Sequence, residues 1–228
     1  MESIEELKDW WAALDSTWKE IFFNALNIEH KPSDQELEEI INLEELTCGG
    51  TGITSLEPVK ALHRLRKLIC FRTAVTDLEP LRNMKSLRQL RCFEVDINTL
   101  EPVSNLENLE EILCDKTKIR DLQAVKNLTN LKVIHFSYTD IETLDPLKNL
   151  LNLERLFFSN TRIESLEPLC NLHKLEKISC NNTRIASLEP LDNLSNLQVV
   201  DCKNSNVSLE EGRRFKEKHP GCIIFYAG

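Results

Sequence analysis

A serine, a histidine and an aspartate lie near one another in this sequence of 228 residues and raise the question of catalysis: Ser137, His135 and Asp115. A nucleophile and its base must approach to about 2.6–3.2 Å. Residues i and i+2 of one strand lie about 6–7 Å apart. We expect Asp115 to meet Ser137 rather than the ring of His135, and no glycine-rich elbow accompanies them. The sequence therefore predicts a protein that is not an enzyme.

The eight cysteines are a second possible source of chemistry. A disulfide framework, a metal site or a redox stripe could use them, but the sequence has no Cys-x-x-Cys pair and no Cys/His cluster at metal-ligand spacing. Six of them recur at one position of a repeat: Cys48, Cys70, Cys92, Cys114, Cys180 and Cys202. We interpret these as reduced thiols packed in a core as small hydrophobic groups, and we expect no metal and no cofactor.

The elements that position all these residues follow from leucines spaced 22 residues apart, which divide the chain into eight coils. These leucines are Leu43, Leu65, Leu87, Leu109, Leu131, Leu153, Leu175 and Leu197. Counted from this leucine, positions 4 and 6 alternate as in a short strand, with positions 3, 5 and 7 on the opposite face. Positions 11, 14, 17 and 20 return apolar groups to the same interior. Stacked coils can bury that interior and pair their strands into a parallel sheet.

The second half of each coil predicts a short helical segment. Position 16 is Pro in six coils, which suits the first turn of a helix, and an acidic residue precedes each of these prolines. Asparagine recurs at position 19 (Asn83 in the second coil), and we expect its side chain to bond turn backbone from coil to coil.

The repeated pattern Ile-x-x-Leu-Glu-Pro-Leu-x-Asn-Leu resembles the leucine-rich-repeat family over residues 43–208. The 22-residue form is most similar to the repeats of bacterial internalins and of the leucine-rich regulatory subunit of protein phosphatase 1. The resemblance implies an α/β solenoid, shaped as a horseshoe or superhelix. Its parallel sheet would lie on the concave face and short helical or 3-10 segments on the convex face. Position 9 departs from the family, with Thr in place of Asn, but a hydroxyl can still bond neighbouring backbone.

Both ends of the repeat array carry helix signatures, which are expected to cover the open ends of the core. Apolar residues of the first 42 residues follow helical spacing, and Ser33 with Glu36 begins a helix that reaches about Ile41. Ser208 starts a helix that reaches about Lys218, and a last strand follows at 222–226. We predict a helical N-terminal cap at 1–42, eight repeats at 43–208 and a C-terminal cap at 209–228, so that the chain is a closed unit.

Function is expected at the strand positions that do not build the coil. Large apolar groups at positions 5, 7 and 8 would form a patch on the concave face, and such patches mark interaction surfaces. The alternative is that these side chains pack on one another or lie under a cap. The predicted partner-binding residues are Ile69, Phe71, Arg72, Arg91, Phe93, Leu113, His135, Tyr138 and Phe157.

A basic cluster lies beside this patch in the second and third coils. Its members are Arg66, Lys67, Arg72, Arg88 and Arg91, against only Glu94. Arginine suits bidentate contacts to carboxylate or phosphate. The cluster could be a solvated face, contact an acidic protein, or bind nucleic acid that stacks on Phe71 and Phe93.

Composition narrows the partner. A net charge of -9 and an isoelectric point near 5.2 argue against nucleic acid. The sequence contains no secretory signal and no span of 18 apolar residues, so we expect a cytoplasmic protein with no membrane association. We predict a scaffold that docks a protein or peptide on its concave face, as a monomer or as a homodimer through that face. The alternative is a regulatory subunit that contacts an enzyme through the basic cluster.

Overall fold

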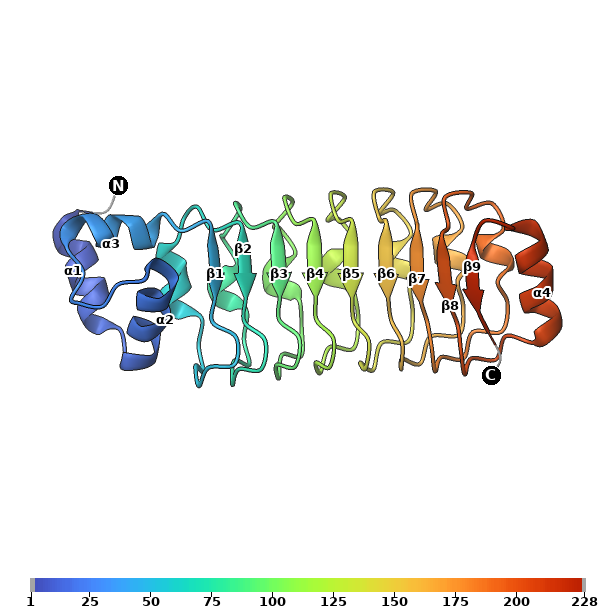
Figure 1. Ribbon diagram of the computed structural model, residues 1–228, viewed down its shortest axis with the longest axis horizontal. Coiled ribbons are helices and arrows are strands. Elements are labelled where there is room, and N and C mark those ends of the chain that lie inside the picture. Colours follow the sequence, from blue (N-terminus) through green and yellow to red (C-terminus); the bar gives the residue numbers. More distant parts are fainter. Residues whose placement is uncertain (1–2, 227–228) are drawn as a thin grey trace.

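The computed structural model describes residues 3–226 as one row of stacked coils with helices at both ends (Figure 1). The coils contribute strands to a single parallel sheet in sequence order, β1 to β9. The strands are β1 (Glu45–Thr47), β2 (Lys67–Ile69), β3 (Gln89–Arg91), β4 (Glu111–Leu113), β5 (Val133–His135), β6 (Arg155–Phe157), β7 (Lys177–Ser179), β8 (Val199–Asp201) and β9 (Ile223–Phe225). Equivalent positions of neighbouring coils pair in register, as Leu46 does with Leu68. The predicted α/β leucine-rich-repeat solenoid is confirmed.

Each coil turns sharply just after its strand, at position 8. Seven of these residues have a positive φ without being glycine, among them Arg72 (49°) and Tyr138 (57°). Left-handed backbone is costly for residues with a side chain, so the coil must supply compensating bonds. The amide of position 8 supplies one, because it donates to the carbonyl of position 7 in the next coil (Tyr138 N to Ser159 O, 2.9 Å).

The core is one continuous cluster that runs the length of the solenoid. The six repeat cysteines are buried in it, as predicted, and two phenylalanines, Phe136 and Phe158, hold the same position in the fifth and sixth coils. Each hydroxyl at position 9 donates to the backbone carbonyl of position 6 in its own coil, as Thr117 does to Cys114 at 2.8 Å. Thr in place of the family's Asn therefore still satisfies the turn, as expected.

Short 3-10 helices form the side of each coil away from the strands. They are η1 (Glu57–Ala61), η2 (Glu79–Leu81), η3 (Glu101–Val103), η4 (Gln123–Val125), η5 (Asp145–Leu147), η6 (Glu167–Leu169) and η7 (Glu189–Leu191). Proline stands in the first turn of every one except η4, as predicted. An oxygen at position 13 accepts the amide of position 15, as Ser165 does from Glu167 at 3.1 Å, and so satisfies a free donor of the first turn.

The asparagine ladder is real, but our prediction of its position was wrong. The position 19 asparagines are exposed. Asparagine at position 22 instead donates to a backbone carbonyl of the preceding coil, as Asn108 does to Lys85 at 2.8 Å and Asn152 does to Thr129 at 2.9 Å. Position 22 lies next to the strand, where neighbouring coils are close enough for a short amide side chain to reach.

Three helices precede the sheet: α1 (Ile4–Ala13), α2 (Ser16–Leu26) and α3 (Asp34–Ile41). Ser33 and Glu36 form the capping box expected at the start of α3, and Ser3 with Glu6 forms a second at α1. The apolar faces of these helices bury Leu7, Trp11 and Phe22 against the first coil.

At the other end, α4 (Leu209–Lys218) precedes the last strand β9. Ser208 caps α4 as predicted, and Phe215 is buried. No helix among residues 3–226 is long and apolar enough to span a bilayer.

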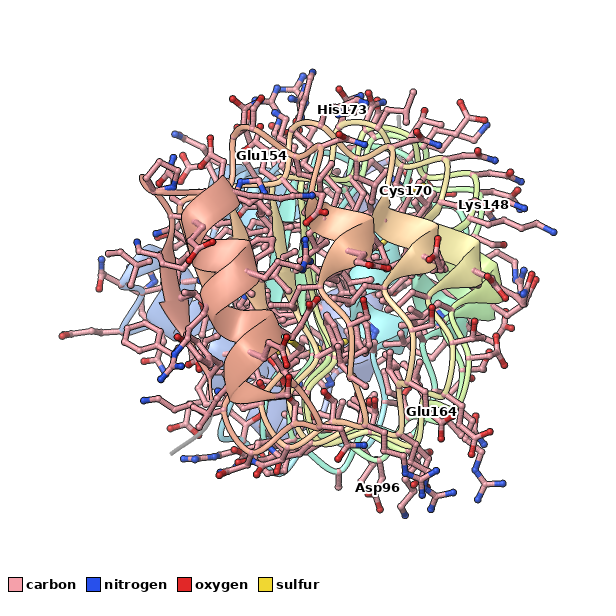
Figure 2. All side chains as sticks on the ribbon, turned by 90° about the vertical axis from the view of Figure 1, so that its right-hand side faces the viewer. Asp96, Lys148, Glu154, Glu164, Cys170 and His173 are labelled. Atoms are coloured by element: carbon pink, nitrogen blue, oxygen red, sulfur yellow. The ribbon has the colours of Figure 1, made fainter. Side chains whose placement is uncertain are left out.

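Thiol chemistry follows from this packing and can be tested directly. Burial raises the pKa of Cys48 and of Cys202 to about 12 and holds the other repeat thiols protonated. Cys170, beside the 3-10 helices, is half-exposed (Figure 2). We expect dithiobisnitrobenzoate to modify one thiol rapidly in the native protein and all eight in denaturant. The rapid equivalent should vanish in Cys170→Ser; several rapid thiols in the native protein would contradict the core assignment.

Candidate binding surface on the strand face

The outward face of the sheet carries an aromatic stack on β2 and β3. The rings of Phe71 and Phe93, two residues beyond their strands, are parallel within 6° and have centroids 4.9 Å apart. Both side chains remain half-buried rather than buried. Ring stacking stabilises the pair beyond the area it buries, and it leaves a flat apolar surface towards solvent.

Gly49 makes room for this stack at the same position of the first coil. A Cβ atom at Gly49 would lie 2.5 Å from the ring of Phe71, closer than real Cβ atoms come. The ring therefore leans over the glycine backbone. Gly49 is not among the predicted site residues, although it is the only glycine at position 7 of the eight coils.

The other predicted apolar residues divide into two groups. Ile69 and Leu113 are half-buried on the strands beside the stack. Phe157 lies apart on β6 and packs against His135, with ring centroids 4.2 Å apart. Tyr138 is 56% exposed at a position 8 turn, with the Lys116 ammonium 5.8 Å from its ring centroid. The predicted patch thus centres on the second to fourth coils, and part of it packs on itself.

The predicted basic cluster is wrong as a region of free positive charge. All five members pair with a carboxylate of a neighbouring coil: Arg66–Glu44, Lys67–Glu45, Arg72–Glu94, Arg88–Glu110 and Arg91–Glu111. The Arg91 pair is the most protected, with Nε 2.7 Å from the carboxylate. The sequence count included only Glu94 and missed four acids that in-register stacking brings alongside.

Glu94 is the centre of a charged row at the position 8 turns. Arg72 Nε lies 2.5 Å from one carboxylate oxygen, and Lys116 Nζ lies 2.9 Å from the other. The hydrogen bond from Arg72, with that from Lys116 second, lowers the pKa of Glu94 to about 2.

This low pKa predicts an acid-linked loss of stability. A carboxyl whose folded pKa is depressed stabilises the fold above its unfolded pKa of about 4.3, and this contribution disappears as the pH falls towards 2. In a carbon-detected NMR titration we expect the Glu94 carboxyl to have its midpoint near 2, and Arg72→Gln to raise that midpoint. A wild-type midpoint near 4.3 would show that the pairs do not form in solution.

The serine, histidine and aspartate do not form a catalytic arrangement. Asp115 accepts the Ser137 amide at 2.7 Å, as expected, but it also lies 3.6 Å from His135 Nδ1, which we did not expect. In the described part of the chain, no hydrogen bond joins the Ser137 hydroxyl to the histidine. Asp115 therefore orders backbone and ring. Nor do residues 3–226 contain a group of three or more His, Cys, Asp or Glu side chains that could hold a metal ion.

The strand face changes character towards the C-terminus. Ser159 and Ser179 share a hydroxyl hydrogen bond of 3.0 Å, and Asn181 donates to Asp201 at 3.1 Å. Arg155 and Lys177 are exposed here at position 3 of adjacent strands. Neither is among the predicted partner-binding residues.

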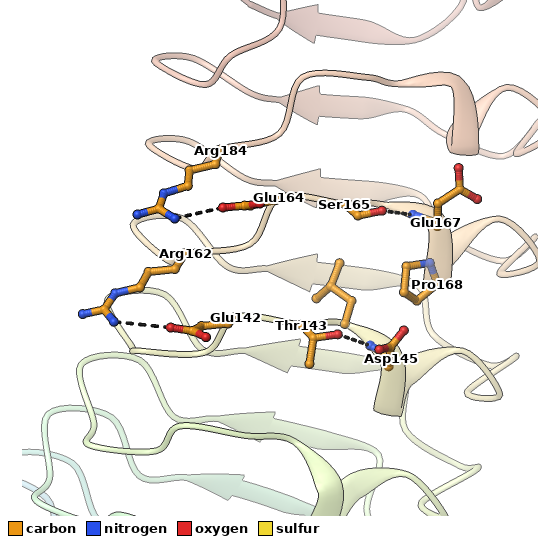
Figure 3. Close-up of a pocket in the computed structure, with 10 residues that line it drawn as sticks. Glu142, Thr143, Asp145, Arg162, Glu164, Ser165, Glu167, Pro168 and Arg184 are labelled. Carbon is orange, nitrogen blue, oxygen red and sulfur yellow. Dashed lines mark hydrogen bonds and ion pairs between the residues drawn. The ribbon is translucent and has the colours of Figure 1, made fainter.

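A shallow hollow of about 400 Å³ lies outside the strand face, between the fifth and seventh coils (Figure 3). Arg162 and Arg184 cross it to Glu142 and Glu164, at 3.3 and 2.8 Å. None of the predicted site residues lines it. Its arginines and glutamates pair with one another and so hold the loops of adjacent coils together.

Comparison with known proteins agrees with this architecture. Residues 129–171 and 151–193 match a family model described as leucine-rich repeats in two copies. Internalin C2 of Listeria monocytogenes has a similar structure, with a TM-score of 0.84 and 24% identity over 93% of this chain and 93% of that one. A second internalin of that organism aligns with a TM-score of 0.68 and 20% identity over 94% of this chain and 75% of its own. None of the curated proteins matches the sequence.

A leucine-rich-repeat protein of Leptospira interrogans is also similar, with a TM-score of 0.77 and 24% identity over 84% of this chain and 50% of that one. At these identities the likeness concerns the fold. The chain has the leucine-rich-repeat fold, and its residues 129–193 match the repeat model. Its fold resembles that of the internalins, and this class of solenoid serves in general as a scaffold for protein interactions.

Proposed function

We propose that this protein is a non-catalytic scaffold that docks a protein or peptide partner on its strand face. The observation that carries the proposal is the Phe71–Phe93 stack, which stays half-exposed although a glycine in the neighbouring coil leaves it room to pack. Aromatic side chains at the centre of a surface supply much of the energy of binding hot spots. Residues 1–42 and 209–228 would serve as caps that keep the repeats in register.

Ile69 and Leu113 would add apolar contacts beside the stack, with Arg91 between them at the same position of β3 and Arg72 at the turn after β2. His135, Tyr138 and Phe157 would form the far side of the surface. Because Arg72 and Arg91 are already paired, they would orient a partner rather than attract it from a distance.

The alternative of an enzyme-regulating subunit that binds through the basic cluster is less favoured. A partner's carboxylates would have to displace Glu94 and Glu111 from arginines that they already contact within 2.7 Å. Such an exchange gains little, because one ion pair replaces another.

The proposal places the protein in the cytoplasm, away from membranes and nucleic acid. The eight cysteines are all free, which suits a reducing compartment. The net charge of -9 opposes a polyanionic partner.

The test uses the full chain to capture a partner from native extract and then measures its affinity for purified variants. Phe71→Glu with Phe93→Glu should weaken binding by at least about 30-fold, since two hot-spot side chains are lost. Gly49→Ala should weaken it less, by displacing one ring. The matched control, Asn149→Glu with Leu151→Glu, adds two carboxylates between η5 and β6, where both residues are exposed.

Unchanged affinity in the double phenylalanine variant would overturn the proposal. Light scattering separates the homodimer from the monomer, because a dimer formed through this face should dissociate in the same variant.

A further inference from the structure

Arg155 and Lys177 are basic residues of the strand face. They are direct neighbours across β6 and β7, and both are exposed. Neither makes an ion pair within the described residues. Like charges placed opposite each other in a sheet repel each other.

In the first five coils, by contrast, basic residues on and near the strand face form ion pairs. Lys67 and Arg91, at positions 3 and 5 of this face, are paired with Glu45 and Glu111. Lys116 and Lys132, near its two borders, are paired with Glu94 and Glu110. The unpaired charges of Arg155 and Lys177 therefore lie in the sixth and seventh coils, outside the cluster that the sequence suggested.

The surroundings of this basic pair fit a carboxylate-bearing ligand. Phe157 follows Arg155 by two residues on the same face and supplies an apolar contact beside it. Glu154 and Glu176 precede the two basic residues at the strand entry without pairing with them, so both cationic heads are available. Lys203, further along, is held over the Phe225 ring at 4.8 Å.

We infer that the docked partner is an acidic peptide segment with two contact points: an apolar side chain on the Phe71–Phe93 stack and carboxylates on Arg155 and Lys177. The charge complementarity of the second point carries this inference, which rests on the proposed function. The two points are separated by about four strand spacings and about four residues along the strand, or about 23 Å. An extended segment of about seven residues spans that distance.

The test uses fluorescent peptides that carry one Trp and one Glu-Glu pair, separated by Gly/Ser spacers of about two, about six or about twelve residues. Anisotropy with the full chain should give the tightest binding for the middle spacer. Replacing Glu-Glu by Gln-Gln should weaken it by about tenfold. Arg155→Gln with Lys177→Gln should weaken the acidic peptide equally and remove its advantage over the amide peptide.

The matched control, Lys126→Gln with Lys148→Gln, removes two exposed charges at the ends of η4 and η5 and should leave binding unchanged. Figure 2 shows Lys148 at this place. The inference is overturned if no peptide binds or if acidic and amide peptides bind equally. It is overturned as well if the control variant weakens binding as much as Arg155→Gln with Lys177→Gln does. It is also overturned if an oligouridine binds more tightly than any peptide and depends on Arg155 and Lys177. A different result would show that the proposed function fails: peptide binding would then be unaffected by Phe71→Glu with Phe93→Glu.

Discussion

Phe136→Ala is expected to lower the free energy of unfolding by about 3–5 kcal/mol. The side chain is fully buried and stacks on Phe158, with ring centroids 5.8 Å apart. The loss combines the transfer of a large apolar group with the cavity it leaves. Each coil packs on its two neighbours, so a hole in the fifth coil weakens both interfaces. Urea unfolding followed by circular dichroism measures the change.

Phe71→Ala is the matched comparison, because it removes the same side chain from the strand face. Phe71 is half-exposed, so we expect a loss of about 1 kcal/mol, mainly from the ring contact with Phe93. Equal losses for the two substitutions would contradict the division between core and surface aromatics on which the proposed site depends.

Arg214→Met is expected to lower the free energy of unfolding by about 2–3 kcal/mol, because it takes the guanidinium away from two part-buried carboxylates. Asp192 keeps Lys218 as a partner, and Glu211 keeps the Leu188 amide. Arg214 on α4 contacts Asp192 at 2.8 Å and Glu211 at 2.7 Å. These acids are only 15% and 16% exposed. The network joins the last helix to the seventh coil, so its loss should open the C-terminal end first. Hydrogen exchange of α4 and β9 amides would locate the opening.

Arg213→Met is the control, since Arg213 is exposed on the same helix and should change stability little. Lowering the pH should reduce the stability of the C-terminal end as Arg214→Met does, because it protonates Asp192. Burial raises the pKa of Asp192, but the hydrogen bonds from Arg214 and Lys218 outweigh it and leave that pKa lowered. The stabilisation is thus present at neutral pH and is lost as the pH falls below the ordinary aspartate pKa of about 3.9. Equal opening of α4 and β9 in Arg214→Met and in Arg213→Met would contradict the claim that the Arg214 ion pairs hold this end closed.

The sequence predicted the fold because one period constrains every level of it. Leucine at positions 1 and 14, alternation at positions 4 and 6, and proline at position 16 each favour the same coil, and eight copies repeat the constraint. The capping signatures at Ser33 and Ser208 were equally local, and both helices begin there.

The ion pairs between coils could not be predicted from the repeat pattern in the same way. The partner of Arg66 is Glu44, one full coil earlier, and the partner of Arg88 is Glu110, one coil later. A count of acids within the second and third coils alone overlooks these partners, which become visible when each position is followed along the stack. Following position 3 along the stack would also have found Arg155 beside Lys177 with no acid at that position nearby.

Side-chain reach was the other limit. We predicted the asparagine ladder at position 19, but it is asparagine at position 22 that reaches the preceding coil. The part of the patch that packs on itself, such as Phe157 on His135, likewise depends on ring orientation, which residue spacing does not determine.

Site-specific photocrosslinking tests the central claim most directly. Benzoylphenylalanine placed at position 93 of the full chain lies on the aromatic stack, and at position 151 it lies on an exposed leucine outside the strand face. Irradiation in native extract should join position 93, but not position 151, to the captured partner. Crosslinking of that partner from position 151 and not from position 93 would contradict docking on the strand face.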